Sequence, residues 1–281
     1  MGIWMNRDVV LSRRGACALA ATSLATLASC ARQATDGAAG EPSQSAVEEE
    51  PTSTIPTVRE QSAYQSCPVG FGAALLLGRI HSIRLIGDSI TAGWGCDGYG
   101  AETDTLIYEG SYGSFYETDA SVACWANDFR TFAAEHGVTD FVNAGISGAK
   151  MRWLAEEPEA WIGAGADAIF VMLGTNDAVY STEDEFAADA ERALSAVRAA
   201  CTHLVVVAPP INDRHDATNL YGPEVLERVL RELCRGQGWE FVSLLNAIEL
   251  GTDLINEDQC HPTSKGSHAL WEHMKGALGL A

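Results

Sequence analysis

Short apolar runs alternate with longer amphipathic segments along most of the chain, from about Ile80 onward. The runs are rich in β-branched or aromatic residues and are bounded by turn-forming residues, a pattern typical of buried strands. The predicted strands are Ser82–Ile86, Asp140–Asn143, Ala168–Leu173, Leu204–Ala208 and Glu240–Leu244. Because helical segments separate these strands, we expect them to run parallel in one sheet.

The segments between the strands have the period of helices that cover a sheet. The predicted helices are Ala123–His136, Ser181–Ala200, Pro223–Arg235 and Ser267–Leu278. The second begins with a Ser-Thr-Glu-Asp capping pattern, and the third begins with proline, which is favoured at a first helical position. The pattern predicts an α/β fold for residues 80–281, a three-layer α/β/α sandwich around a five-stranded parallel sheet.

Four polar motifs follow the predicted strands or precede the last helix. They are Gly87-Asp88-Ser89-Ile90, Ile146-Ser147-Gly148, Gly174-Thr175-Asn176-Asp177 and Asp258-Gln259-Cys260-His261. Ligands of parallel α/β sheets bind at the carboxyl ends of the strands, where we expect all four motifs to meet. Each motif alone is common in turns or surface loops, so their combination carries the prediction.

The four motifs together supply the groups that acyl transfer needs. Ser89 is a candidate nucleophile, His261 a base that takes its proton, and Asp258 a carboxylate that orients the imidazole. The backbone N–H groups of Ser89 and Gly148 and the side-chain amide of Asn176 are candidate oxyanion donors. The sequence therefore predicts a serine hydrolase.

In this order the motifs resemble the blocks of the SGNH (GDSL-type) hydrolases, a family named for its Ser, Gly, Asn and His residues. The resemblance covers residues 80–281 and implies a flavodoxin-like sheet and a covalent acyl-enzyme. It implies that Ser89, His261 and Asp258 form the catalytic triad, and that Gly148 and Asn176 complete the oxyanion hole. No G-x-S-x-G motif occurs, which argues against the α/β-hydrolase fold.

A long insertion, Gly95–Val122, lies between the nucleophile and the first long helix. Its tyrosines either stack on sugar rings of a substrate or pin the insertion to the domain, and the sequence leaves both readings open. These candidate substrate-binding residues are Tyr99, Tyr108, Tyr112 and Tyr116. We expect Trp94, Trp125 and Trp153 to be core or pocket-wall residues.

The resembled family includes carbohydrate esterases, lipases and thioesterases. We expect a small-molecule or glycan ester as substrate, with short-chain O-acetyl carbohydrate esters preferred. The alternatives are a lipase or lysophospholipase, a thioesterase-type acyl hydrolase, and a catalytically silent glycan-binding lipoprotein. The net charge of −20 argues against binding nucleic acid. No cofactor and no metal are expected, because no zinc-ligand spacing occurs and residues 212–216 resemble an ordinary polar loop.

The beginning of the chain resembles an export signal. Arg7, Arg13 and Arg14 precede the apolar run Gly15–Ala28, and the run ends at Cys30 in a Leu-Ala-Ser-Cys sequence similar to a bacterial lipobox. The Ser-Arg-Arg triplet also resembles a twin-arginine signal. We expect a signal peptide over residues 1–29, then lipidated Cys30 and a disordered acidic tether over residues 30–79. The protein would then be anchored to the outer face of the cytoplasmic membrane.

Six cysteines remain after Cys17 and Cys30 are set aside, which suggests disulfides in an exported protein. The favoured pairs are Cys96–Cys124, which bracket the insertion, and Cys201–Cys234, expected at the sheet edge opposite the motifs. Cys260 is either bonded to Cys67 or a buried thiol.

Overall fold

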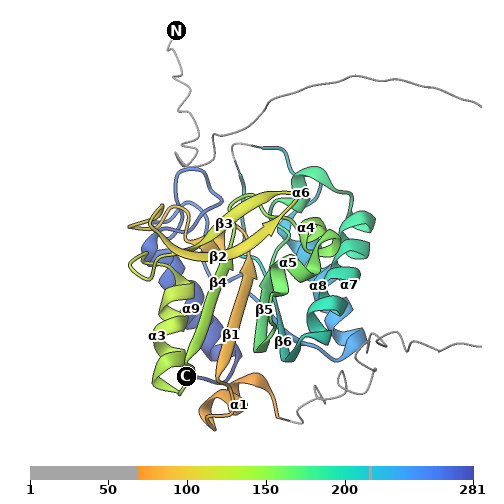
Figure 1. Cartoon of the computed structure of the whole chain (residues 1–281). Helices are drawn as coiled ribbons and strands as arrows, with labels where there is room; N and C mark the ends of the chain where they lie inside the picture. Colours follow the sequence, from red (N-terminus) through yellow and green to blue (C-terminus); the bar gives the residue numbers. More distant parts are fainter. Residues whose placement is uncertain (1–68, 215–216) are drawn as a thin grey trace, which may run out of the picture. The chain divides into compact units, whose positions relative to one another are not determined.

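The structure is a computed structural model that describes residues 69–214 and 217–281 (Figure 1). The predicted signal peptide, the lipidated Cys30 and Cys67 lie outside the described residues. Among the described residues, none of the helices has the length and apolar character needed to cross a membrane.

A five-stranded parallel sheet forms the centre of the described domain (Figure 1). Its strands lie in the order β4-β1-β5-β6-β7, and every neighbouring pair is parallel. The strands are β1 (Ser82–Gly87), β4 (Asp140–Gly145), β5 (Ala166–Met172), β6 (Cys201–Ala208) and β7 (Glu240–Ser243). The five strands predicted from apolar runs are confirmed, with ends that move by one or two residues in most cases and by three at the start of β6.

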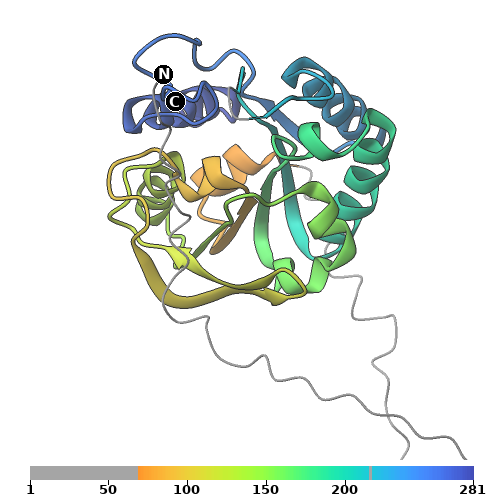
Figure 2. The same cartoon turned by 90° about the horizontal axis from the view of Figure 1, so that it is seen from above.

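Helices cover both faces of the sheet, as Figure 2 shows from above. One layer contains α1 (Phe71–Leu76), α3 (Trp125–Glu135) and α9 (Ser264–Ala277), and the other contains α4 (Met151–Glu156), α5 (Pro158–Ile162), α7 (Glu183–Ala199) and α8 (Pro223–Gln237). Two short helices, α2 (Ser89–Ala92) and α6 (Asp177–Tyr180), follow β1 and β5 at the carboxyl edge of the sheet. The three-layer α/β/α fold is confirmed.

The strands send alternate side chains into two apolar clusters, one under each helical layer. Ile83 and Leu85 of β1 pack in the cluster that includes α3 and α9, while Ile86 joins the cluster that includes α7 and α8. This alternation follows from the two-residue period of a strand. Both faces of β1 are covered toward its carboxyl end, where Leu85, Ile86 and Gly87 are buried in succession, while Ser82 and Arg84 near its start are half-buried.

The folded part begins earlier than residue 80, so the predicted tether is too long at its end. Phe71 in α1 is fully buried and lies with its ring 4.9 Å from that of Phe170, at an interplanar angle of 85°. The backbone N–H of Phe71 donates to the Glu240 carboxylate at 2.9 Å. Phe71, together with the buried Leu75 and Ile80, therefore ties this segment to the core.

The insertion after Ser89 is a β-hairpin rather than a plain loop. Strands β2 (Glu102–Gly110) and β3 (Gly113–Thr118) pair antiparallel and form a separate two-stranded sheet that crosses the main sheet on the side of β4 (Figures 1 and 2). Residues between Gly110 and Gly113 make the turn, and Gly113 has a φ of 125°. The hairpin was missed because most of its side chains are exposed, which leaves no apolar run.

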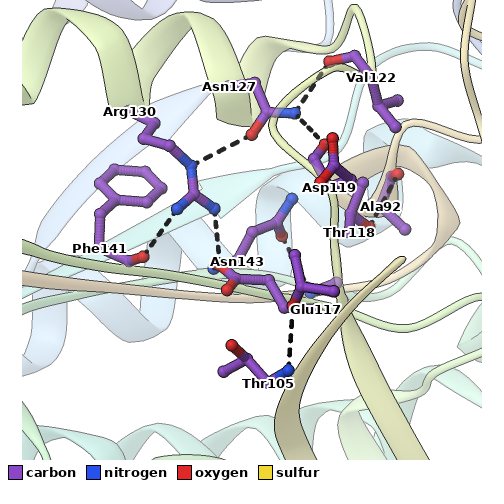
Figure 3. A network of polar contacts seen from close by, with 12 residues as sticks. Ala92, Thr105, Glu117, Thr118, Asp119, Val122, Asn127, Arg130, Phe141 and Asn143 are labelled. Atoms are coloured by element: carbon purple, nitrogen blue, oxygen red, sulfur yellow. Dashed lines mark hydrogen bonds and ion pairs between the residues drawn. The ribbon is translucent and has the colours of Figure 1, made fainter. Parts of the chain in front are cut away.

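A buried ion pair fastens the hairpin to the outer edge of β4 (Figure 3). Glu117 of β3 lies 2.6 Å from Arg130 of α3 and also accepts the backbone N–H of Asn143 at 2.8 Å. Arg130 donates to the carbonyl of Phe141 at 3.0 Å and to Asn127 at 3.3 Å. Because β4 pairs only with β1, these contacts satisfy backbone groups on an edge that another chain could otherwise pair with.

The two favoured disulfides are absent from the structure. Cys96, Cys124, Cys201 and Cys234 are buried thiols. The thiol of Cys201 donates to the carbonyl of Val197 at 3.3 Å, and that of Cys96 to the carbonyl of Pro262 at 3.8 Å. Bracketing a loop or sharing a sheet edge does not fix how two Cβ atoms face each other, which is what a disulfide requires.

Candidate active site

The end of β1 places Ser89 at the carboxyl edge of the sheet. Ser89 begins the short helix α2, and the carboxylate of Asp88 caps this helix by accepting the N–H of Ile90 at 3.0 Å. The helix lies so close to β4 that a Cβ on Gly145 would stand 2.4 Å from the backbone nitrogen of Ala92. Glycine at position 145 thus lets the turn that bears Ser89 pack directly on the sheet.

Ser89, His261 and Asp258 form a continuous hydrogen-bonded line. Ser89 Oγ lies 2.8 Å from His261 Nε2, and His261 Nδ1 lies 2.7 Å from Asp258 Oδ2. Asp258 Oδ1 also accepts the backbone N–H groups of Cys260 at 2.9 Å and His261 at 3.0 Å. Burial acts to raise the pKa of Asp258, but the two N–H groups and the His261 ring outweigh it and lower that pKa. The carboxylate is therefore held ionised beside the imidazole.

The loop that carries Asp258 and His261 is tightly constrained. Asn256 Nδ2 donates to the carbonyls of His261 and Pro262, both at 3.0 Å. Gln259 has a φ of 53°, a left-handed conformation rarely adopted by residues other than glycine, and its side chain bonds to Gly251 and Asn256. These contacts fix the turn in which acid and base stand three residues apart.

Three candidate hydrogen-bond donors belong to the segments that follow β1, β4 and β5 at the carboxyl edge of the sheet: Ser89, Gly148 and Asn176. Among residues 69–214 and 217–281, the backbone N–H groups of Ser89 and Gly148 donate to no other group. Asn176 Nδ2 donates one hydrogen to the carbonyl of Ala149 at 3.0 Å, which leaves its second hydrogen for another acceptor. Gly148 has a φ of 83°, and no atom lies within 4 Å of where its Cβ would be. A substrate oxygen could therefore approach its backbone.

Two buried carboxyl groups, those of Asp88 and Asp177, are next in sequence to Ser89 and Asn176. Burial raises the pKa of Asp88 to about 7, and Asp177 adds to this increase. Burial likewise raises the pKa of Asp177 to about 6, although Asp177 Oδ2 accepts the N–H of Met151 at 2.9 Å. The bond to Met151 fixes the start of α4, directly after the loop that contains Gly148.

The four tyrosines of the insertion do not form one surface. Tyr108 is fully buried, with its ring 5.0 Å from that of Trp161, so the prediction that it binds substrate is wrong. Tyr112 stacks on Trp153 with ring centres 4.2 Å apart and bonds through its hydroxyl to Glu156. These two residues support the alternative in which tyrosines pin the insertion to the domain.

Tyr99 and Tyr116 are exposed, and Tyr99 contacts the loop that contains Gly148. Its hydroxyl lies 2.7 Å from Ser147 Oγ, and its ring centre lies 6.4 Å from that of Trp94. Tyr116 is on β3, where it pairs across the hairpin with Leu106.

Two residues outside the four motifs contact the site. The ring of Trp94 lies 4.0 Å from that of His261 and is 38% exposed, which agrees with a pocket wall and not with the core. Arg214 Nη1 donates to Asn176 Oδ1 at 3.4 Å, from a segment expected to be an ordinary polar loop. Trp94 is close in sequence to Ser89, which is a usable signal; nothing in the sequence links Arg214 to Asn176.

The arrangement suits general-base activation of a serine hydroxyl. A hydroxyl, an imidazole and an ionised carboxylate lie in a row, and within the described residues the N–H of Ser89 itself donates to no other group. Among the described residues, His, Cys, Asp and Glu side chains form no group of three that could hold a metal ion.

Comparison with known proteins agrees with the fold. Axe2, an acetylxylan esterase from Geobacillus stearothermophilus, is 19% identical, with 72% of this chain and 95% of that chain covered and a TM-score of 0.54. LAE5, described as an alpha/beta hydrolase enzyme from the metagenome of Lake Arreo, Spain, is 18% identical, with 71% and 95% covered and a TM-score of 0.56. No curated protein matches the sequence.

The sequence also matches a protein family, and this match identifies more than the fold. Residues 85–269 match the GDSL-like Lipase/Acylhydrolase family, a span that includes all four polar motifs. This span covers more than half of the chain and agrees with the resemblance noted from the motifs. The chain belongs to the GDSL-like lipase/acylhydrolase family and is a carboxylic ester hydrolase of that type.

Proposed function

We propose that the protein is a serine esterase that removes short acyl groups, acetyl above all, from carbohydrate esters. The observation that carries the proposal is the hydrogen-bonded line from Ser89 through His261 to Asp258. Ser89 is the nucleophile, His261 the general base and Asp258 the residue that orients and stabilises the imidazolium.

In the first half of the reaction, Ser89 Oγ attacks the ester carbonyl while His261 Nε2 takes its proton. The carbonyl oxygen becomes an oxyanion, which the N–H groups of Ser89 and Gly148 and the Asn176 amide stabilise. The intermediate collapses, the carbon–oxygen bond to the alcohol breaks, and His261 gives the proton to the leaving alcohol.

The second half releases the acyl group. Water loses a proton to His261 and attacks the acyl-Ser89 ester, and the same donors hold the second oxyanion. The bond to Ser89 Oγ breaks, His261 returns the proton to the serine, and a carboxylic acid leaves. The lowered pKa of Asp258 supports this cycle, because an ionised carboxylate favours the imidazolium that forms twice.

Two observations favour carbohydrate acetyl esters within the family. The structural neighbour Axe2 is described as an acetylxylan esterase, and the match covers 95% of that chain. The net charge of −20 also disfavours an anionic lipid surface as substrate. Lipases, lysophospholipases and thioesterases remain the competing activities within the family, and a silent glycan-binding protein is the competing function outside it.

The test compares the wild type with Ser89→Ala on p-nitrophenyl esters of increasing acyl length and on acetylated xylan. We expect turnover of acetate esters, release of acetate from the xylan, and labelling of the wild type alone by a fluorophosphonate. Turnover confined to esters of long acyl chains would contradict the acetylesterase activity and indicate a lipase. An unlabelled wild type without turnover would indicate the binding protein.

We further propose that the domain is exported and held at the outer face of the cytoplasmic membrane by lipidated Cys30. The basic start, the apolar run and the Leu-Ala-Ser-Cys sequence support this location. A Cys30→Ala variant should move from the membrane fraction to the soluble fraction, with Cys17→Ala as the matched control. Equal membrane retention of both variants would refute the lipid anchor.

A further inference from the structure

Two aromatic side chains extend from the proposed catalytic base: Trp94 packs against the ring of His261, and Tyr99 lies next to Trp94. The ring of Trp94 lies 4.0 Å from the imidazole of His261 at an interplanar angle of 43°, and the ring of Tyr99 lies 6.4 Å from that of Trp94. We call Trp94 and Tyr99 the aromatic wall. Its contact with His261 makes it continuous with the catalytic centre.

The two rings of the aromatic wall are partly exposed to solvent, unlike the buried aromatic residues of the domain. Trp94 is 38% exposed and Tyr99 is 41% exposed, whereas Tyr108 and Trp125 are each 1% exposed. Single exposed aromatics are common, but two neighbouring rings next to a reactive histidine form an apolar surface without a partner in the described domain. Such a surface at a catalytic centre is suited to contact with substrate.

The loop that carries the aromatic wall is firmly attached to the loop that carries His261. Asn256 Nδ2 donates to Gly95 at 3.4 Å as well as to Pro262 at 3.0 Å, so one amide joins both loops. Ser264 Oγ accepts the N–H of Asp97 at 2.8 Å and donates to the Asp97 carboxylate at 2.9 Å. The wall is therefore fixed in place relative to the base.

Polar groups border the aromatic wall. The hydroxyl of Tyr99 lies 2.7 Å from Ser147 Oγ, and Ser147 is the residue before Gly148. Apolar ring faces with hydroxyl groups at their edge match a sugar ring, which has C–H faces and hydroxyls at its own edge.

The chemistry decides which part of the ester meets this wall. The acyl carbonyl oxygen must point at the N–H donors, and the leaving alcohol oxygen must lie at His261, which protonates it. Because Trp94 packs against His261, the wall adjoins the alcohol part of the ester and not the acyl part. We propose that Trp94 and Tyr99 form the subsite that binds the sugar ring carrying the ester. This inference rests on the proposed function.

The test measures selectivity between two acetate esters that differ in the alcohol, glucose pentaacetate and ethyl acetate. The alcohol of ethyl acetate is too small to cover the wall. We expect Trp94→Ala to lower the ratio of kcat/KM for the sugar ester to kcat/KM for ethyl acetate at least tenfold. Tyr99→Ala should lower the same ratio about threefold to tenfold, while Trp94→Phe, which keeps a ring, should restore most of it.

Leu76→Ala is the control, because Leu76 is 50% exposed and lies in α1, ahead of the start of β1. It should leave the ratio within twofold of the wild type. An unchanged ratio in Trp94→Ala would overturn the proposal. So would a loss in that variant confined to ethyl octanoate relative to ethyl acetate, because the wall would then bind the acyl chain.

A binding experiment separates this inference from the proposed function. Calorimetric titration of glucose pentaacetate into Ser89→Ala, and into Ser89→Ala combined with Trp94→Ala, reports binding without turnover. We expect the second substitution to weaken binding at least fivefold. A wild type that hydrolyses neither ester and escapes fluorophosphonate labelling refutes the serine esterase. If the wild type is active but Ser89→Ala binds glucose pentaacetate equally well with and without Trp94→Ala, only the sugar subsite is refuted.

Discussion

Asp258 holds His261 by its ring and by its backbone at once: Oδ2 lies 2.7 Å from Nδ1, and Oδ1 accepts the N–H of His261 at 3.0 Å. A single carboxylate therefore sets both the orientation of the imidazole and the conformation of the short loop that carries it. The same carboxylate keeps a lowered pKa in spite of its burial, because the hydrogen bonds it accepts favour the charged form.

Asp258→Asn should lower kcat by about three orders of magnitude while the protein stays folded. The asparagine keeps the size of the side chain, but when its NH2 group faces Nδ1 the proton moves to Nε2, which then cannot accept a proton from Ser89. The measurement is kcat on p-nitrophenyl acetate together with the melting temperature. Asp258→Ala should lose as much activity and also some stability, because it leaves two N–H groups without their acceptor. A loss of less than tenfold in both variants would contradict the role of Asp258.

The buried Asp88 should make the folded state less stable as the pH rises. Its pKa is about 7 in the fold against an ordinary 3.8, so the folded protein binds the extra proton between these values. The free energy of unfolding should therefore fall as the pH increases toward 7, by at most about 1.4 kcal/mol per pH unit for this group. Asp177, with a pKa of about 6, adds to the same trend.

Asp88→Asn isolates that contribution, because an asparagine oxygen can still accept the N–H of Ile90. Urea unfolding at pH 5 and pH 8 should show a smaller decrease in the variant than in the wild type. Glu224→Gln, a change of charge on an exposed side chain at the start of α8, is the control. Parallel pH profiles for Asp88→Asn and the wild type would show that Asp88 does not titrate in this range.

The sequence was sufficient to predict the sheet and the meeting of Ser89 with His261 and Asp258 for one physical reason. Buried parallel strands produce apolar runs, and the polar motifs that follow Gly87 and Gly145 must then lie at the same edge. The pairing of Gly87 with both Gly145 and Met172 shows how closely the strand ends align. Ser89 is brought to His261 by this alignment and by a loop whose acid and base are neighbours in sequence.

What the sequence failed to predict depends on contacts between distant segments. The hairpin β2–β3 has few buried side chains of its own and is attached by Glu117 to Arg130 and β4. The burial of Tyr108 depends on its packing against Trp161, which is distant in sequence, so no local pattern could show it. Whether two cysteines bond likewise depends on side-chain directions in the packed core.

Glu117→Ala should lower the free energy of unfolding by about 3 kcal/mol, because it leaves Arg130 without its ion partner and the N–H of Asn143 without its acceptor. Glu117→Gln keeps an acceptor oxygen and should cost less. The measurement is urea unfolding, with the exposed Glu109→Ala on the same hairpin as a control expected within about 0.5 kcal/mol of the wild type. If Glu117→Ala and Glu109→Ala unfold at the same urea concentration, the ion pair does not fasten the hairpin.

The buried thiols should resist alkylation until the protein unfolds. Burial raises the pKa of Cys96, Cys201 and Cys234 to about 12 and also raises the pKa of Cys124, so almost no thiolate is present at pH 8. Iodoacetamide without a reductant should leave these four residues unmodified in the native protein and modify all four in guanidinium, as peptide mass spectrometry would show. If a pair of these cysteines stays unmodified in guanidinium until a reductant is added, the pair is bonded, and the predicted Cys96–Cys124 or Cys201–Cys234 disulfide exists after all. A melting temperature that falls on addition of the reductant would point the same way, because a disulfide that closes a loop of this length stabilises a fold by about 3 kcal/mol.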